Sequence, residues 1–235
     1  MIRHHPDSNV LMEYAAGTLP WAMSLAVGAH LQLCPRCREG RHQLDCVGGG
    51  LLRHTEPQAV HSDSLARVLQ RIDQDENNPS QSDLIGPEVN TAHSAAVDSG
   101  NRDRPLDQLP RLVDKLVRDN QPLHWRRMSS SLQMARLASG QNQCEVALQR
   151  IRQGGKVVEH DHRGREITLV LYGSFSDADG VYAPGDFLVR EPGEVHRPMA
   201  TQDQECLCLS VAEAAVSVTG ILGWLVNPLL RFRPA

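Results

Sequence analysis

The stretch GGKVVEHDHRGREITLVLYG, residues 154–173, decides the fold of the larger part of this chain. In this stretch, one residue separates His160 from His162, and Glu166 follows shortly after them. A glycine stands at each end of the stretch. Residues i and i+2 of a β-strand point to the same face, so both imidazoles can reach one metal ion. The stretch therefore predicts a strand that carries metal ligands, followed by an apolar strand at residues 167–172.

A second, partial motif supplies one more candidate ligand. Gly185 is followed by a Glu-Pro-Gly turn at residues 191–193 and then by His196. Three imidazoles and one carboxylate can hold Zn, Mn, Fe or Ni, and the residue types do not choose among these metals. The candidate ligands of this first predicted metal site are His160, His162, Glu166 and His196. The alternative is an exposed histidine pair with an unrelated third histidine.

Short apolar runs surround the two motifs between residue 106 and the end of the chain. They predict strands at residues 123–128, 132–137, 145–151, 167–172, 186–189 and 206–211, after one short helix at 107–118. Turns rich in glycine, proline and aspartate separate the runs. Many short strands with such turns are typical of a β-sandwich or a barrel.

The spacing of the two motifs resembles that of the cupin motifs. This resemblance implies a double-stranded β-helix barrel with a metal ion held by the four candidate ligands. The first motif matches in full. In the second, Pro192 is one place late, and Ala200 stands where an asparagine is common.

Proline and glycine positions divide the first 75 residues into four predicted helices. Their starts are expected at Ser8, at Pro20, at Pro35 and at Ser62 or Asp63. The third helix is expected to fray into the glycine triplet at residues 48–50. The fourth shows the i, i+3, i+4, i+7 spacing of an amphipathic helix, with Leu65, Val68, Leu69 and Ile72.

A second predicted metal site lies in HLQLCPRC, residues 30–37. His30, Cys34 and Cys37 are spaced so that they converge whether or not the intervening proline breaks the helix. Thiolate and imidazole groups form closed, tetrahedral structural zinc sites. The sequence therefore predicts a structural zinc here, and the alternative is two buried thiols and a core histidine.

The fourth ligand of this zinc site is left open by the spacing. His4 and His5 both qualify, because the first helix must pack back on the second. His42 and Cys46 form another i, i+4 pair, but His42 lies well around the helix from Cys37. The upstream histidines are therefore favoured over this pair.

The stretch IRHHPDSNVLMEYAAGTLPWAMSLAVGAHLQLCPRC, residues 2–37, resembles the N-terminus of the ChrR-type zinc-binding anti-sigma factors. The YAAGTL and AxHLxLCxxC segments carry the resemblance. It implies that His5 is the upstream zinc ligand and that a cupin-like domain follows the helices. It also implies zinc in the cupin site, and an extracytoplasmic-function-type sigma factor as the partner in a heterodimer. The implied function is to inhibit that sigma factor and to release it on an oxidative or photo-oxidative signal.

A change of composition marks the predicted domain boundary. Residues 76–105 are rich in Asn, Ser, Asp, Pro and Gly and show no periodicity, which is typical of a flexible linker. We therefore predict an α+β protein with a helical zinc-binding domain at residues 1–75 and a metal-binding sensor barrel at residues 106–235.

Composition argues against several other classes of function. A net charge of −4 and an aromatic content of 4% do not favour nucleic-acid binding. The uncharged run at residues 214–230 contains Gly, Pro, Asn, Ser and Thr, so a membrane span is not expected. The start MIRHHPDSN lacks an apolar segment, and six cysteines without an export signal indicate the cytoplasm.

Two rival functions remain at this point. The first is a metal-dependent cupin enzyme, such as a dioxygenase or an isomerase, with a zinc-stabilised helical appendage. The second is a zinc-finger DNA binder, which the lack of a clear basic helix disfavours. Cys206 and Cys208 are expected to be core residues of the barrel, with a redox role as the alternative. We expect a regulator without catalytic activity.

Overall fold

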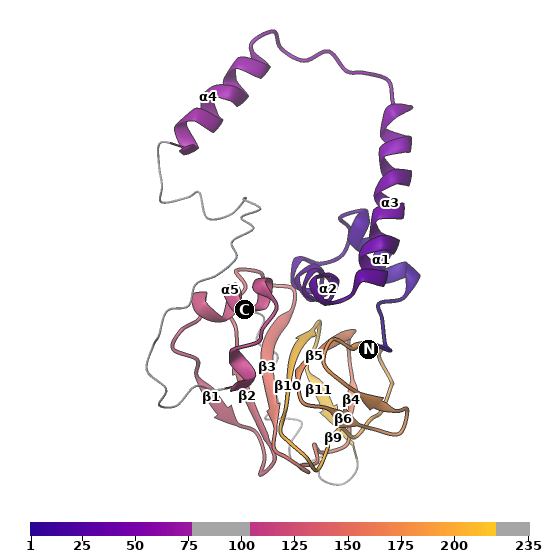
Figure 1. Ribbon diagram of the computed structural model, residues 1–235, viewed down its shortest axis with the longest axis vertical. Helices are drawn as coiled ribbons and strands as arrows, with labels where there is room; N and C mark the ends of the chain where they lie inside the picture. Colours follow the sequence, from indigo (N-terminus) through magenta and orange to yellow (C-terminus); the bar gives the residue numbers. More distant parts are fainter. Residues whose placement is uncertain (77–103, 220–235) are drawn as a thin grey trace. The chain divides into compact units, whose positions relative to one another are not determined.

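The computed structural model describes residues 1–76 and 104–219. Contacts divide the chain into one unit of residues 1–49 and 102–235 and a second unit of residues 50–101. The larger unit combines N-terminal helices with a β-barrel (Figure 1). The predicted linker at residues 76–105 lies almost entirely outside the described residues, so the domain boundaries stay a prediction.

The predicted helices are present in the described residues. They are α1 (Ser8–Ala15), α2 (Trp21–Leu33), α3 (Pro35–Arg53), α4 (Ser64–Glu76) and α5 (Arg111–Asp119), with a 3₁₀ turn at Arg104–Leu106. A break separates α2 from α3 at Cys34, directly before the proline that opens α3. This break turns the chain at the predicted zinc site.

Two details of the predicted helices were wrong. Asp7, and not Ser8, caps α1, because its Oδ1 accepts the N–H of Val10 at 2.8 Å. Helix α3 runs through the glycine triplet at residues 48–50 instead of fraying there. Glycine costs a helix about 1 kcal/mol per residue relative to alanine, whereas a break of the proline kind costs about 3 kcal/mol. The triplet therefore weakens this helix without ending it.

The strands form three sheets. They are β1 (Trp125–Arg127), β2 (Leu132–Arg136), β3 (Glu145–Ile151), β4 (His160–His162), β5 (Glu166–Tyr172), β6 (Phe175–Ser176), β7 (Val181–Tyr182), β8 (Phe187–Arg190), β9 (Met199–Ala200), β10 (Cys206–Ala212) and β11 (Val216–Val218). The large sheet has the order β1-β2-β3-β10-β5-β8, and smaller sheets pair β11 with β4 and β7-β6-β9. Strand β10 lies at the centre, antiparallel to both β3 and β5.

Glycine is required where β5 ends. Gly173 has φ 64°, and a Cβ there would lie 2.0 Å from the carbonyl oxygen of Glu205. No other residue fits so close a backbone approach. The glycine that closes the first motif therefore allows the chain to leave the sheet beside β10.

One core continues from the helices into the barrel. Met23 and Val27 of α2 belong to the same buried cluster as Val113 of α5, Leu148 of β3 and Phe187 of β8. Helix α2 contacts α5, β5 and β10. The periodicity of the sequence did not predict that α2 packs against the barrel.

Cys206 and Cys208 belong to a second, smaller core cluster, as expected for barrel residues. Their sulfurs lie 3.6 Å apart, and both side chains are buried. The contact with Cys206, together with burial, raises the pKa of Cys208. A thiol with a raised pKa and no access to solvent is a poor nucleophile.

None of the helices within residues 1–76 and 104–219 is long and apolar enough to cross a membrane. Most of the apolar run at residues 214–230 lies outside this range. Strand β11, at Val216–Val218, is its described part.

Candidate functional site

The structure brings together the four residues predicted to bind zinc. His5 precedes α1, His30 lies in the last turn of α2, Cys34 follows that helix, and Cys37 lies in the first turn of α3. One ligand atom from each lies within 4.8 Å of the others. The turn between α2 and α3 therefore presents both sulfurs to both imidazoles.

The imidazoles of this zinc set are oriented for metal binding. His5 Nδ1 lies 3.4 Å from the sulfur of Cys34 and 3.4 Å from that of Cys37. His30 donates its Nδ1–H to the carbonyl oxygen of Gly185 at 2.8 Å. Its buried Nε2 has no hydrogen-bond partner among the described residues. A buried acceptor without a partner is costly, and a metal ion would satisfy it.

The chemistry of the set also fits zinc. Burial, followed by the hydrogen bond with Cys34, raises the pKa of Cys37 to about 12. Two adjacent buried thiols therefore need a cation before both can ionise. Two thiolates and two imidazoles are a common tetrahedral zinc set.

The other histidines near this site lie elsewhere. His4 Nδ1 lies 3.3 Å from Asp186 and outside the cluster, whereas His5, the other histidine that spacing left open, lies within it. His42 and Cys46 contact each other on an exposed side of α3, with Nε2 and Sγ 3.9 Å apart. They take no part in the cluster.

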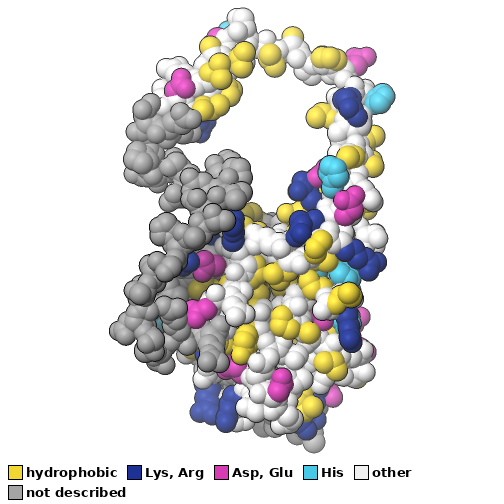
Figure 2. All heavy atoms as spheres, in the orientation of Figure 1, with side chains coloured by type: hydrophobic (Ala, Val, Ile, Leu, Met, Phe, Trp, Pro, Cys, Tyr) yellow, Lys and Arg dark blue, Asp and Glu magenta, His cyan; other side chains and the backbone are white. Residues whose placement is uncertain are grey.

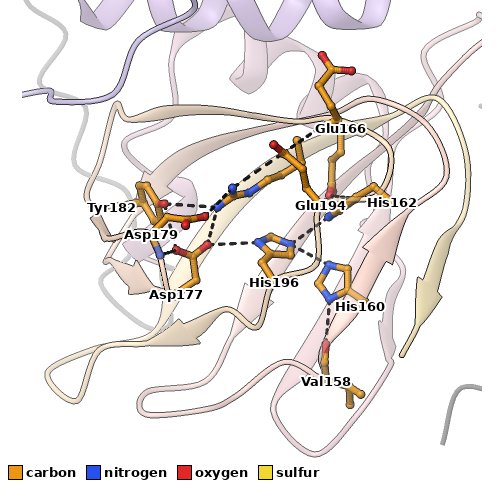
Figure 3. Close-up of polar contacts among 11 residues, drawn as sticks. Val158, His160, His162, Glu166, Asp177, Asp179, Tyr182, Glu194 and His196 are labelled. Atoms are coloured by element: carbon orange, nitrogen blue, oxygen red, sulfur yellow. Dashed lines mark hydrogen bonds and ion pairs between the residues drawn. The ribbon is translucent and has the colours of Figure 1, made fainter. Parts of the chain in front are cut away.

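The second predicted set also comes together (Figure 3). His160 and His162 lie on β4, Glu166 opens β5, and an antiparallel bridge places His196 opposite His160. His196 Nε2 lies 3.0 Å from the Nε2 of His160 and 3.1 Å from that of His162. Three ring nitrogens therefore point to one place inside the barrel.

The opposite nitrogen of each ring is held by the protein. His160 donates its Nδ1–H to the carbonyl oxygen of Val158 at 2.9 Å, and His162 donates to Glu166 at 3.0 Å. His196 donates to Oδ2 of Asp177 at 3.3 Å (Figure 3). These contacts fix the tautomers, so that every Nε2 offers a lone pair to a metal ion.

Burial favours the neutral form of His160 and His196. Burial, followed by the neighbouring His160 and His162, lowers the pKa of His196 to about 4. Burial also lowers the pKa of His160. Neutral imidazole is the form that binds metal, so the set suits a cation at neutral pH.

Glu166 is fully buried but charged. Burial alone would raise its pKa, yet the hydrogen bond and the charge of His162 and the hydroxyl of Ser210 outweigh burial and lower it. One carboxylate oxygen contacts His162, and the other accepts a hydrogen bond from Ser210. The negative charge of Glu166 next to the ring nitrogens of the set complements a divalent cation.

Known proteins match both halves of the chain. A family model described as the ChrR cupin-like domain matches residues 113–216, and a zinc-finger model matches residues 9–38. The anti-sigma-E factor ChrR of Cereibacter sphaeroides is 34% identical over 230 residues, which is 98% of this chain and 99% of that protein. The chain belongs to the ChrR family of anti-sigma factors.

A solved structure supports the family at the level of the fold. It is the crystal structure of Rhodobacter sphaeroides SigE in complex with the anti-sigma ChrR, with 32% identity and a TM-score of 0.69. The match covers 90% of this chain and 99% of that chain. The predicted α+β fold, with zinc-binding helices before a cupin barrel, is therefore confirmed. The family is one of regulators, so the expectation of a non-enzyme is confirmed as well.

The zinc-finger match and the Cys/His cluster together indicate zinc at the N-terminal set of this ChrR-family chain. For the cupin set, the residues fit a divalent metal ion without choosing one. The Nε2 atoms of the three histidines and the Glu166 carboxylate would hold such an ion.

Sequence reasoning missed the residues that hold His196. Asp177 accepts hydrogen bonds from His196 and Tyr182 and pairs with Arg190 at 2.7 Å. Arg190 also pairs with Asp179 at 2.8 Å. The sequence indicates only that these two aspartates belong to a turn. No motif relates them to His196, which follows almost twenty residues after Asp177.

A cavity of about 300 Å³ opens beside the cupin set of this ChrR-family member. His160 and Glu166 line part of it, and the rest is mainly apolar, with Met134, Val158 and Val218 in its wall. Its size is at the lower end of the range typical of small-molecule sites. The cupin set therefore borders a mainly apolar cavity in addition to the polar side chains that hold its histidines.

Proposed function

We propose that this chain is an anti-sigma factor that binds an extracytoplasmic-function-type sigma factor through its N-terminal helices. We further propose that the cupin barrel senses an oxidative or photo-oxidative signal and releases the sigma factor. Membership of the ChrR family, across nearly the whole chain, supports the first statement. The solved complex of the related ChrR with SigE supports a heterodimer.

The observation that carries the proposal is an exposed apolar surface on two of the described helices. On α4, Leu65, Val68, Leu69 and Ile72 are 49–70% exposed. Figure 2 shows hydrophobic side chains gathered along this helix. Contiguous apolar side chains on a protein surface mark a site of protein–protein interaction.

Helix α3 offers a similar surface in its C-terminal half. Val47, Leu51 and Leu52 are 61–71% exposed there. An amphipathic helix that binds a partner presents its apolar face at i, i+3, i+4 and i+7 positions. We expect α3 and α4 to cover the sigma factor with these faces and to block its polymerase-binding surfaces.

The two metal sites have different roles in this proposal. His5, His30, Cys34 and Cys37 would hold a structural zinc that fixes the turn between α2 and α3. His160, His162, Glu166 and His196 would hold the metal of the sensor, and family resemblance supports zinc there. Neither site is proposed to catalyse a reaction. We expect the protein in the cytoplasm, where it would bind the sigma factor.

The route of the signal is a direct contact in this proposal. Helix α2 packs on β5 and β10, and the side chain of Glu13 in α1 pairs with Arg165 of the barrel at 3.1 Å. A change in the barrel can therefore reach the helices without passing through the segment at residues 76–105. Two states that the signal stabilises differently are required for such a switch.

Co-purification of the full chain with a sigma factor from the same genome tests the proposed function. Leu69→Glu should abolish capture, because it places a charge in the apolar face of α4. Gln70→Glu adds the same charge at an exposed polar neighbour and should keep capture. Equal capture by both variants would show that this face does not bind the sigma factor.

A further inference from the structure

A loop of the barrel, residues 183–187, lies against the N-terminal zinc set. Within this loop, Asp186 is 1% exposed and accepts the backbone N–H groups of Arg3 at 2.7 Å and His4 at 3.0 Å. The carbonyl oxygen of His4 accepts the N–H of Phe187 at 3.1 Å. Both sides of His4 are thus fixed to the barrel, and the next residue is the predicted ligand His5.

The other imidazole of the zinc set is held by the same loop. His30 donates its Nδ1–H to the carbonyl oxygen of Gly185, and the Phe187 ring packs edge-on against it with the ring centres 5.5 Å apart. Gly185 has φ 91°, and a Cβ there would lie 2.6 Å from the side chain of Ile2. Only glycine lets the N-terminal segment lie this close to the loop.

The loop itself is anchored in the sheet. The N–H of Gly185 donates to the carbonyl oxygen of Val170 at 2.8 Å, and the carbonyl oxygen of Asp186 accepts the N–H of Val170 at 3.0 Å. The Oδ2 atom of Asp186 also accepts the N–H of Ala183 at 2.9 Å. The carboxylate of Asp186 therefore joins the N-terminal segment to the loop, and the backbone of the loop is joined to β5.

We propose that Gly185 and Asp186 are positioning residues of the N-terminal zinc site, so that the barrel completes a site whose four ligands all lie in the helical part. This inference rests on the proposed zinc site. The two cysteines come from one turn and need no help from the barrel. The two histidines come from separate segments, and each is oriented by the loop. Groups that orient metal-binding histidines typically contribute 10- to 100-fold in metal affinity.

The same loop connects the zinc site with the cupin set. Strand β8 begins at Phe187 and ends at Arg190, which pairs with Asp177. Asp177 in turn holds His196. The first residue of β8 therefore contacts His30 of the zinc set. Its last residue pairs with Asp177, which accepts a hydrogen bond from His196 of the cupin set.

The test uses the full chain loaded with Co²⁺ in place of zinc. Thiolate-to-cobalt absorption reports only the N-terminal site, because the cupin set contains no cysteine. Asp186→Asn removes the carboxylate, and Gly185→Ala disturbs the loop without changing its charge. Both should release cobalt to a chelator about 10- to 100-fold faster than the wild-type chain, with a shifted absorption band.

Matched controls separate this effect from general damage. Asp203→Asn changes an exposed acid of the barrel, and Gly140→Ala changes a glycine with φ 70° that has nothing within 4 Å of its Cβ position. Both should match the wild-type chain. The metal content of the cupin set reports whether each variant is folded.

The possible outcomes distinguish this inference from the proposed function. If the wild-type chain shows no thiolate-to-cobalt band, the zinc site itself is wrong. If the band is present and folded Asp186→Asn and Gly185→Ala variants release cobalt at the wild-type rate, the zinc site stands and the role of the loop is overturned. Should Asp186→Asn fail to fold, Gly185→Ala decides alone.

Discussion

Each histidine of the cupin set has one nitrogen that faces the other two rings and one that is held by the protein. The holding groups differ: a carbonyl oxygen for His160, a buried glutamate for His162 and an aspartate for His196. Asp177 is the most informative of these groups, because it is fully buried and also carries the ion pair with Arg190.

We expect Asp177→Asn to weaken metal binding at the cupin set by about 10- to 100-fold, because His196 loses its charged support. After a chelator wash, the wild-type chain should retain nearly two equivalents of metal and the variant nearly one. Asp179→Asn is the matched control, since Asp179 pairs with the same arginine but is 62% exposed. Two retained equivalents in Asp177→Asn would contradict the prediction.

A second prediction at this scale concerns the zinc cysteines. Cys37→Ser should unfold the turn between α2 and α3 and abolish sigma capture, because structural zinc contributes about 10–16 kcal/mol in small domains. Circular dichroism and co-purification measure the two effects. Cys46→Ser changes an exposed cysteine of the same helix and should neither unfold the turn nor abolish sigma capture. A zinc-free Cys37→Ser variant with normal sigma affinity would refute the role of the zinc.

Single residues were predictable where chemistry and spacing coincide. All eight predicted ligands lie in the two clusters, because histidine, cysteine and glutamate at short spacings leave few other arrangements. The choice of His5 over His4 depended on the family resemblance and on Asp186, which is distant in the sequence. Asp177 and Ser210 could not be predicted, since their partners meet them only through the sheet.

Among the helices, α2 packs closely against both α1 and α5 at Gly28. A Cβ at Gly28 would lie 2.9 Å from Leu112 of α5 and 3.4 Å from the hydroxyl of Tyr14 in α1. The glycine therefore allows three helices to meet. Gly48 of α3 does not allow a close approach of this kind, because nothing lies within 4 Å of its Cβ position.

These two glycines lead to predictions of opposite sign. Gly28→Val should lower the free energy of unfolding by about 1–3 kcal/mol, because it overpacks the junction of α2 with α5. Gly48→Ala should instead stabilise α3 locally by about 1 kcal/mol, because alanine favours a helix. Denaturant unfolding measures the first, and amide hydrogen exchange in α3 measures the second. Destabilisation in both variants would show that α3 needs its glycines for packing.

The elements differ in how well their sequences predicted them. Strand β3 was predicted at its observed residues 145–151, where its apolar residues Val146, Ala147, Leu148 and Ile151 are buried. Strands β6, β7 and β9 have two residues each, too few to show a period of two. Their positions follow from the closure of the barrel, which depends on the whole domain.

At the scale of the whole molecule, inhibition and sensing are expected to separate. His162→Ala should keep sigma inhibition but blunt release after an oxidant, because it removes a ligand of the sensor and leaves α3 and α4 unchanged. Transcription from a sigma-dependent promoter, with and without the oxidant, measures both. Loss of inhibition without the oxidant in a folded variant would place the barrel within the inhibitory surface.

The distance along the chain between His30 and Gly185 has a consequence for synthesis. The two residues are 155 positions apart. At about 5–20 residues per second, a ribosome needs roughly 10–30 s to make the intervening chain. For that time, the nascent helices carry both cysteines and both histidines without the loop that orients the histidines. Newly made chains thus pass through a stage in which the ligands of the zinc site exist before the barrel that orients two of them.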